Sequence, residues 1–194
     1  MSAALWLLAG LVIAAALGVL KSRYATFWAQ TPDDYAGQTD LRFDIRERLQ
    51  GPIQCEGVIY GPLGRVSSRF VADFHATWTG NTCVMTETFH YDSGNVQNRE
   101  WNLTLGNDGR IKATAPDLVG PGEGMQKGSA VLLNYRIKLS DDAGGHVLDT
   151  TDWMYLMQNG SIMNRSQFRK FGIKVAELVA TMRPAQTRQM TAGE

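Results

Sequence analysis

The sequence predicts a mainly β protein, in which an antiparallel meander of eight or nine strands closes into a barrel after one N-terminal transmembrane helix. Two observations predict this fold. Residues 3–20 form an unbroken apolar run, and beyond residue 53 apolar side chains recur at every second position between regularly spaced turn signals. The first pattern is typical of a membrane-spanning helix, and the second of half-buried antiparallel strands.

The apolar run carries no charge, and Lys21 and Arg23 follow it directly. An α-helix of this length extends roughly 27 Å, close to the ~30 Å hydrocarbon core of a bilayer. A cleaved signal peptide is disfavoured, because no basic side chain precedes the run and the residues after it make a poor cleavage site. A lipoprotein is disfavoured because the first cysteine is Cys55. We therefore expect residues 1–23 to be an uncleaved single-pass anchor.

The charges beside this span predict which side the barrel occupies. Basic residues that flank a span tend to stay in the cytoplasm. Lys21 and Arg23 therefore favour a bacterial inner-membrane protein with a cytoplasmic barrel, and we expect both side chains to contact lipid head groups. Asp33 and Asp34 offset these charges in part, so a periplasmic barrel is the alternative. Residues 3–20 are rich in Ala and Gly, which would also allow close packing within an integral membrane protein complex.

Composition limits the remaining possibilities. The chain has 194 residues, and 19 basic side chains balance 19 acidic ones, so no basic field points to a nucleic-acid partner. Cys55 and Cys83 have a spacing that suits neither a zinc cluster nor a redox pair. Two separate buried thiols are favoured, with a single disulfide as the alternative. No histidine pair has short metal-ligand spacing, so we expect no metal and no cofactor.

Between the anchor and the first strand, residues 24–52 form a linker that approaches the barrel. Phe27 and Trp28 follow the basic pair, where aromatic rings can lie at the membrane interface. Residues 41–49 have apolar side chains at helical spacing and form either a short helix or an irregular entry into the first strand. The predicted domains are an anchor (1–23), this linker, a barrel (53–183) and a flexible tail (184–194).

Residues 65–78 show the clearest strand pattern, because their apolar side chains alternate with polar ones. Turn signals rich in Gly, Asn and Asp then recur at near-regular intervals. Residues 119–125 are rich in glycine but lack the lysine and the spacing of a phosphate-binding loop, so they are interpreted as a wide loop at the barrel mouth. A meander of this length removes its edges by closing. The expected strands are 54–60, 66–79, 82–91, 96–105, 110–118, 128–139, 146–157, 161–168 and 172–182.

Alternation along two neighbouring strands places Glu87 and Arg99 among apolar side chains. Because a buried lone charge is costly, the two residues are expected either to form an ion pair that sets the strand register or to anchor the polar end of a ligand. In the ligand-binding interpretation, the cavity is lined by Phe70, Phe74, Trp78, Met85, Phe89 and Trp101.

A basic cluster on the last predicted hairpin contains Arg165, Arg169 and Lys170. It is either a solvated turn or a contact surface for lipid phosphates or an acidic partner. Residues 152–156, which are aromatic and apolar with one acid, are more typical of a core than of a ligand site.

Several stretches of the soluble part resemble one bacterial family, the domain of unknown function 3833. They are residues 43–80, the segment FHYDSGNVQNREW, the run ATAPDLVG and above all TDWMYLMQNGSIMNRSQFRKFGIKVAEL. The resemblance covers about residues 42–183 and implies a lipocalin-like (calycin-type) barrel associated with a membrane. Many members resemble envelope lipoproteins, which implies a periplasmic location, but this chain has no cysteine beside its apolar run. Members often lie near genes for fatty-acid modification, which implies lipid handling. No binding or catalytic residue can be transferred from the family.

Three functions follow as hypotheses. The first is a membrane-tethered barrel that binds a lipid or fatty acyl ligand. The second is an accessory or structural subunit of an inner-membrane complex. The third, and least favoured, is a lipid-modifying enzyme, which would need an inward-facing acid such as Asp117 or Asp152, or a histidine.

Overall fold

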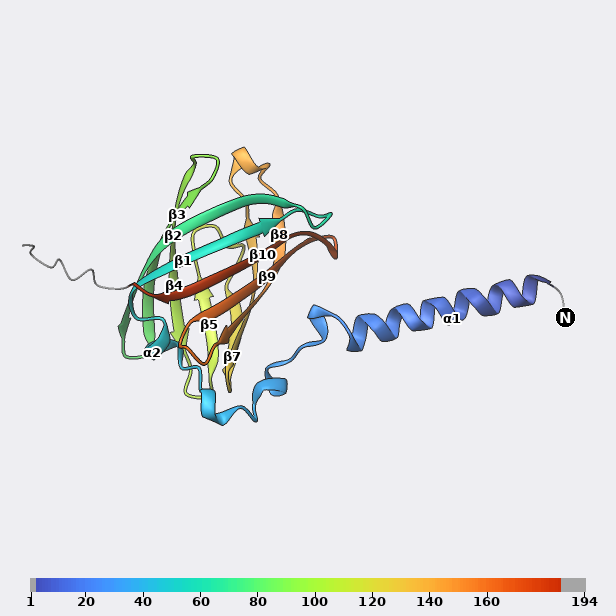
Figure 1. Cartoon of the computed structure of the whole chain (residues 1–194), viewed down its shortest axis with the longest axis horizontal. Coiled ribbons are helices and arrows are strands. Elements are labelled where there is room, and N and C mark those ends of the chain that lie inside the picture. The colour runs from blue at the N-terminus through green and yellow to red at the C-terminus, as the bar shows by residue number, and fades with distance from the viewer. Residues whose placement is uncertain (1–2, 186–194) are drawn as a thin grey trace, which may run out of the picture.

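A computed structural model describes residues 3–185 (Figure 1). Helix α1 (Ala3–Tyr24) extends away from a barrel whose lower end carries the short helix α2 (Ile45–Arg48). The strands are β1 (Gly51–Tyr60), β2 (Val66–Thr79), β3 (Thr82–Tyr91), β4 (Val96–Leu105), β5 (Arg110–Thr114), β6 (Gly122–Lys127), β7 (Ala130–Lys138), β8 (Val147–Leu156), β9 (Ile162–Lys170) and β10 (Ile173–Pro184).

The barrel is an up-and-down meander. Each strand pairs antiparallel with the next one in the chain, and β10 pairs with β1 to close the sheet. The turns therefore alternate between two ends of the barrel. The closed end receives α2, and the mouth end carries the β1–β2, β3–β4, β5–β6, β7–β8 and β9–β10 connections. The prediction of a mainly β barrel after an N-terminal apolar helix is confirmed.

The structure has ten strands rather than the predicted eight or nine, because β6 forms within and just beyond the glycine-rich stretch that was interpreted as a loop. A Cβ atom at Gly124 would lie 2.2 Å from the carbonyl oxygen of Leu132, and one at Gly122 would lie 3.2 Å from that of Asn134. These glycines allow close backbone approach within the sheet, a role that composition does not distinguish from turn formation. Only residues 115–121 remain a loop at the mouth.

Apolar side chains pack inside the closed end of the barrel. Phe43, Ile45 and Leu49 are buried and belong to the same apolar cluster as the inward side chains of the strands. The side chain of Asp44 accepts a hydrogen bond from the backbone N–H of Arg46, which caps the start of α2. Residues 41–49 therefore contain a short helix, Ile45–Arg48, one of the two forms considered from sequence.

The juxtamembrane segment, defined here as residues 25–41, packs against the outer wall of the barrel. It contains three 3-10 turns, at Phe27–Ala29, Pro32–Tyr35 and Thr39–Leu41. Phe27 forms a second apolar cluster with Ala130 and Trp153, against which Tyr35 also packs. Trp153 and Ala130 are each only 1% exposed, so the outer face of β7 and β8 is covered around these two residues. The sequence indicated a core position for residues 152–156 but not this covering segment.

Helix α1 is apolar on all sides, and its large side chains are exposed. By length and composition, Ala3–Lys21 could cross a membrane, and a signal sequence would meet the same criteria. Among the described elements, its contacts are with the first 3-10 turn of the juxtamembrane segment. The helix therefore joins the barrel through that segment.

Gly128 provides a test of how tightly the juxtamembrane segment is seated. A Cβ atom there would lie 1.7 Å from the carbonyl oxygen of Tyr35, and the φ of Gly128 is +53°. Gly64 has a φ of +78° and open space around it. We expect Gly128→Ala to lower the free energy of unfolding by about 2 kcal/mol more than Gly64→Ala, because only the first adds a backbone clash to the conformational strain. Urea unfolding of both variants checks this, and equal losses would contradict the close contact.

Candidate functional site

The barrel encloses a cavity of about 340 Å³. Residues from strands on all sides of the barrel contribute to its wall, which is mostly apolar. Seven of the eight residues predicted to form the site line this cavity. They are Phe70, Phe74, Met85, Glu87, Phe89, Arg99 and Trp101. The rings of Phe70, Phe74 and Phe89 meet edge to face, which gives this part of the wall a defined shape.

Trp78 is the eighth predicted residue, and the structure places it elsewhere. Its indole N–H donates a 2.7 Å hydrogen bond to the carbonyl oxygen of Leu49, next to α2. Trp78 has the inward parity of its strand but lies near the closed end, beyond the cavity. Alternation predicts the face of a strand that a residue occupies, but not its depth in the barrel.

Glu87 and Arg99 lie opposite each other on β3 and β4, as the hairpin prediction required. The side chain of Glu87 is buried, and its Oε2 accepts a hydrogen bond of 3.2 Å from the indole N–H of Trp101. The nearest guanidinium nitrogen of Arg99 lies 3.6 Å from the same oxygen. Glu87 lines the cavity, and no described residue donates a hydrogen bond to its Oε1 atom.

The stronger partner of Arg99 is Asp117. The Nε and Nη2 atoms of Arg99 donate to its two carboxylate oxygens at 2.7 and 3.2 Å. This bidentate pair occupies the Nε–Nη2 edge of the planar guanidinium, whose geometry matches a carboxylate. The sequence placed Asp117 near the end of an expected strand, 110–118, and suggested it only as a residue to consider for catalysis. The structure ends β5 at Thr114, so Asp117 lies in the loop that follows.

The Arg99–Asp117 pair bridges a gap in the sheet. Ladder pairing between β4 and β5 ends where Asn102 meets Thr114. Pro116, two residues further, has no N–H to donate, so the ladder cannot continue normally. The backbone N–H of Lys138 instead donates to the carbonyl oxygen of Asp117, and this loop joins β7. The first half of β4 is thus left without a partner on this side, and we call the gap the β4 seam.

A wider groove of about 1170 Å³ surrounds the β4 seam at the mouth. It shares Glu87, Arg99 and Tyr91 with the wall of the interior cavity. These polar side chains therefore lie between an apolar interior and an open entrance. This is the arrangement of a small-molecule site, in which a few placed polar groups orient a ligand whose bulk is apolar.

A second polar group lines the cavity from β7, β8 and β9. Asp152 accepts hydrogen bonds from Asn164 and, at 2.9 Å, from the hydroxyl of Ser166, and the Tyr135 hydroxyl also bonds to it. All four residues line the cavity. Sequence analysis named Asp152 only as a possible catalytic acid and missed the other three. Their inward parity on adjacent strands was the signal that could have identified them.

Burial raises the pKa of both inward acids. The pKa of Glu87 rises to about 7, although Arg99 and the indole N–H of Trp101 oppose this. Burial also raises the pKa of Asp152, against the effect of the hydrogen bonds from Asn164 and Ser166. Glu87 can therefore carry a proton near neutral pH. The cavity lining does not include His75, His90 or His146, and residues 3–185 contain no cluster of side chains suited to a metal.

Of the two cysteines, Cys55 lines the cavity and Cys83 lies outside its lining. Both are free and buried in the described structure, as the favoured interpretation had it. Burial raises the pKa of the Cys83 thiol to about 11 and that of Cys55 further. Buried thiols with raised pKa values react slowly.

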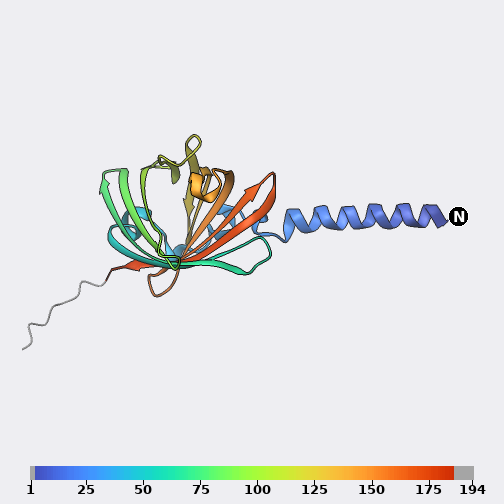
Figure 2. The same ribbon diagram turned by 90° about the horizontal axis from the view of Figure 1, so that it is seen from above.

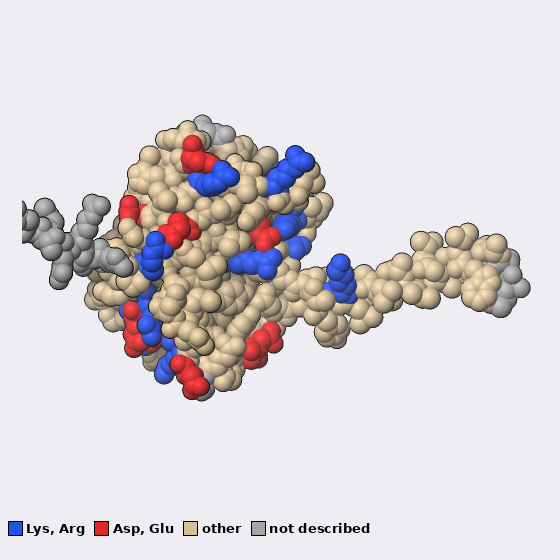
Figure 3. Space-filling model, viewed as in Figure 1, with Lys and Arg blue, Asp and Glu red and all other residues tan. Residues whose placement is uncertain are grey.

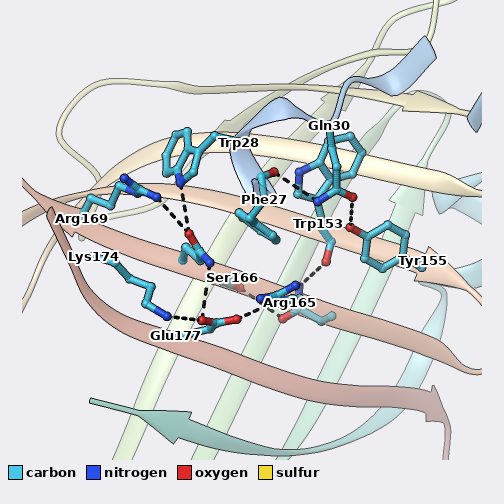
Figure 4. A network of polar contacts seen from close by, with 12 residues as sticks. Phe27, Trp28, Gln30, Trp153, Tyr155, Arg165, Ser166, Arg169, Lys174 and Glu177 are labelled. Atoms are coloured by element: carbon cyan, nitrogen blue, oxygen red, sulfur yellow. Dashed lines mark hydrogen bonds and ion pairs between the residues drawn. The ribbon is translucent and has the colours of Figure 1, made fainter. Parts of the chain in front are cut away.

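Arg165 and Arg169 of β9 contact the juxtamembrane segment (Figure 4). Arg165 forms a 2.6 Å ion pair with Glu177 and lies over the ring of Phe27. Arg169 lies over the ring of Trp28, 4.3 Å from its centre. The indole N–H of Trp28 donates to the side chain of Gln167 at 3.1 Å. Arg165 and Arg169 are thus engaged within the chain rather than on a solvated turn.

Lys170, together with Lys21 and Arg23 of α1, is more accessible for contacts outside the chain. The Lys170 amine lies 2.9 Å from a ring nitrogen of His146 at the mouth end. Lys21 and Arg23 are exposed at the end of α1. Contact of these three residues with lipid head groups stays a prediction.

The raised pKa of Glu87 predicts how stability depends on pH. Between its usual value of 4.5 and about 7, the folded protein holds a proton that the unfolded chain releases. Stability therefore falls as pH rises through this window, by on the order of 3 kcal/mol from Glu87. Urea unfolding at several pH values measures the fall.

We expect Glu87→Gln to flatten this pH dependence. Glu56→Gln is the control. The hydrogen bond from Arg183 lowers the pKa of Glu56, so ionisation of Glu56 makes stability rise with pH rather than fall. A Glu87→Gln variant with an unchanged slope would show that Glu87 is ionised in the fold.

Comparisons with known proteins agree with this architecture. The phycobiliprotein lyase CPES of Guillardia theta is 11% identical, with a TM-score of 0.58, and the match covers 82% of this chain and 99% of that one. Rv2717c of M. tuberculosis is 13% identical, with a TM-score of 0.51, covering 72% and 94%. At these identities the likeness shows a shared lipocalin-like barrel fold alone. No curated protein shows significant sequence similarity to the chain. A family model described as "Protein of unknown function (DUF3833)" matches residues 23–184, so the chain belongs to this family, as the sequence motifs indicated.

Proposed function

We propose that this protein is a membrane-tethered barrel that binds one lipid or fatty acyl ligand in its interior. The observation that carries the proposal is the cavity, which is apolar inside and polar where it meets the mouth. Small-molecule sites typically occupy about 300–1,000 Å³, and the cavity lies within that range. Each methylene buried there would stabilise the complex by about 0.8 kcal/mol, so chain length would contribute strongly to affinity.

The charges at the site favour one type of polar end group. Three carboxylates, those of Glu87, Asp117 and Asp152, lie near a single guanidinium, that of Arg99. Asp117 already occupies the fork of Arg99, so a ligand carboxylate would have to displace it. A hydrogen-bond donor can instead reach the unpartnered Oε1 of Glu87. The ligand's polar end is therefore an amine, amide or hydroxyl rather than a free acid.

The alternative is an accessory subunit of an inner-membrane complex. The observation that favours it is α1, whose Ala and Gly positions are exposed. Small residues allow close contact between helices within a bilayer. A stable larger assembly extracted in mild detergent would support this alternative.

Filling the cavity tests ligand binding directly. Ala176 lines the cavity on β10, whereas Val71 is exposed on the outer face of β2. We expect the full chain, extracted in detergent, to retain a lipid-sized ligand in native mass spectrometry. Ala176→Phe should lower the bound fraction about tenfold or more, since each tenfold corresponds to about 1.4 kcal/mol of lost contact. Val71→Phe should leave it unchanged. An empty wild-type protein, or equal retention by both variants, would contradict the proposal.

The end-group preference has its own test. Dodecylamine, dodecanol and dodecanoate share one chain, and their binding to the full chain can be compared by native mass spectrometry in one detergent. We expect the amine and the alcohol to bind better than the carboxylate. Asp152→Asn, which removes a carboxyl group that a ligand amine would favour in its ionised form, should reduce the preference for the amine over the carboxylate severalfold. Tighter binding of dodecanoate would refute the end-group preference while leaving the apolar cavity supported.

A further inference from the structure

The turn between β9 and β10 has an unusual residue at its tip. Phe171 and Gly172 form a two-residue turn between the paired Lys170 and Ile173, with φ values of 52° and 77°. Such a turn strongly favours Asn-Gly, because both positions need a positive φ. Phe171 is the one non-glycine residue with a positive φ among those that the structure describes. It is 90% exposed, so no packing in the barrel offsets the strain.

One more exposed apolar side chain follows this turn in the chain, and another lies at the tip of the neighbouring turn. Leu63, in the β1–β2 turn, is 89% exposed, and Ile173 is 70% exposed. Because β1 pairs with β10, these two turns are neighbours at the mouth end. At the same end, the β3–β4 turn, Asp92-Ser93-Gly94-Asn95, is polar, and Val119 in the β5–β6 connection is 42% exposed. The most exposed apolar side chains of the mouth-end turns therefore lie on the side of β1 and β10.

That side is the one from which α1 leaves. Both turns lie at the edge of the barrel nearest α1 in two perpendicular views (Figures 1 and 2). Chain connectivity gives the same result. Trp28 stacks on Arg169, which is two residues before Phe171, and Trp28 is only four positions after the end of α1 at Tyr24. Four such steps along the chain span at most about 14 Å.

The same flank carries basic side chains, which gather on its upper part (Figure 3). Arg65 is exposed in the β1–β2 connection and forms no ion pair within residues 3–185. Lys170 lies next to Phe171, with its amine 5.7 Å from the ring centre. Apolar tips flanked by Lys and Arg are typical of protein surfaces that lie in the interface of an anionic bilayer.

We propose that Leu63, Phe171 and Ile173 insert into the leaflet surface of the bilayer that holds α1, with Arg65 and Lys170 at its phosphates. This rests on the tethering proposed above and goes beyond it, because it gives the barrel a fixed orientation. One side of the mouth lies against lipid. A ligand can then pass between the leaflet and the cavity through the mouth.

Spin labels on the full chain test this directly. Leu63→Cys and Phe171→Cys place a nitroxide on each tip, and Ser93→Cys places one on the β3–β4 turn at the same end. Cys55 and Cys83 are buried and resist labelling. In nanodiscs of phosphatidylcholine and phosphatidylglycerol, we expect the labels at 63 and 171 to collide more with oxygen than with a water-soluble nickel complex. The label at 93 should show the reverse.

Phe171→Asn separates membrane contact from folding. Asparagine suits the turn, so the apparent Tm should stay unchanged or rise, while the label at 63 should become severalfold more accessible to the nickel complex. Labels at 63 and 171 as water-accessible as the one at 93 would overturn the insertion. Failure of the full chain to enter nanodiscs would instead refute the tethering on which it rests.

Discussion

Closure of the sheet through β1 and β10 is the constraint on which the rest of the structure depends. Once the two strands pair, every strand has an inner and an outer face, and no edge is left over most of the circumference. The inner face then holds both the apolar wall and the few polar groups within it. The seam beside β4 is the exception. There a proline interrupts the ladder, and the Arg99–Asp117 pair replaces the missing backbone hydrogen bonds with a side-chain bridge.

Much of the fold follows from local patterns in the sequence. Alternation in β2, β3 and β4 was strong enough to place Glu87 opposite Arg99 and to identify seven of the residues that line the cavity. These predictions succeeded because parity along a strand is a local property. The position of Trp78 beyond the cavity could not be predicted, because its depth depends on how α2 closes the end of the barrel.

The features that sequence analysis missed depend on contacts between distant segments. Strand β6 was hidden because its glycines serve close approach to β7 rather than a turn. Phe27 and Trp28 were placed where their rings could lie at the membrane interface, but Phe27 is buried against Trp153, more than a hundred residues away. The expected strand 110–118 ends early, at Thr114, and the backbone of Asp117 pairs with β7 instead.

Trp28 is held by Arg169 and Gln167, and these contacts limit how the barrel can move relative to α1. A flexible connection would let the barrel rotate freely relative to α1, whereas this contact holds the residues next to α1 against β9. Long apolar helices tilt when the bilayer is thinner than their span. If α1 spans a bilayer as proposed, its tilt would be transmitted to the barrel through this contact, and bilayer thickness would change the orientation of the barrel.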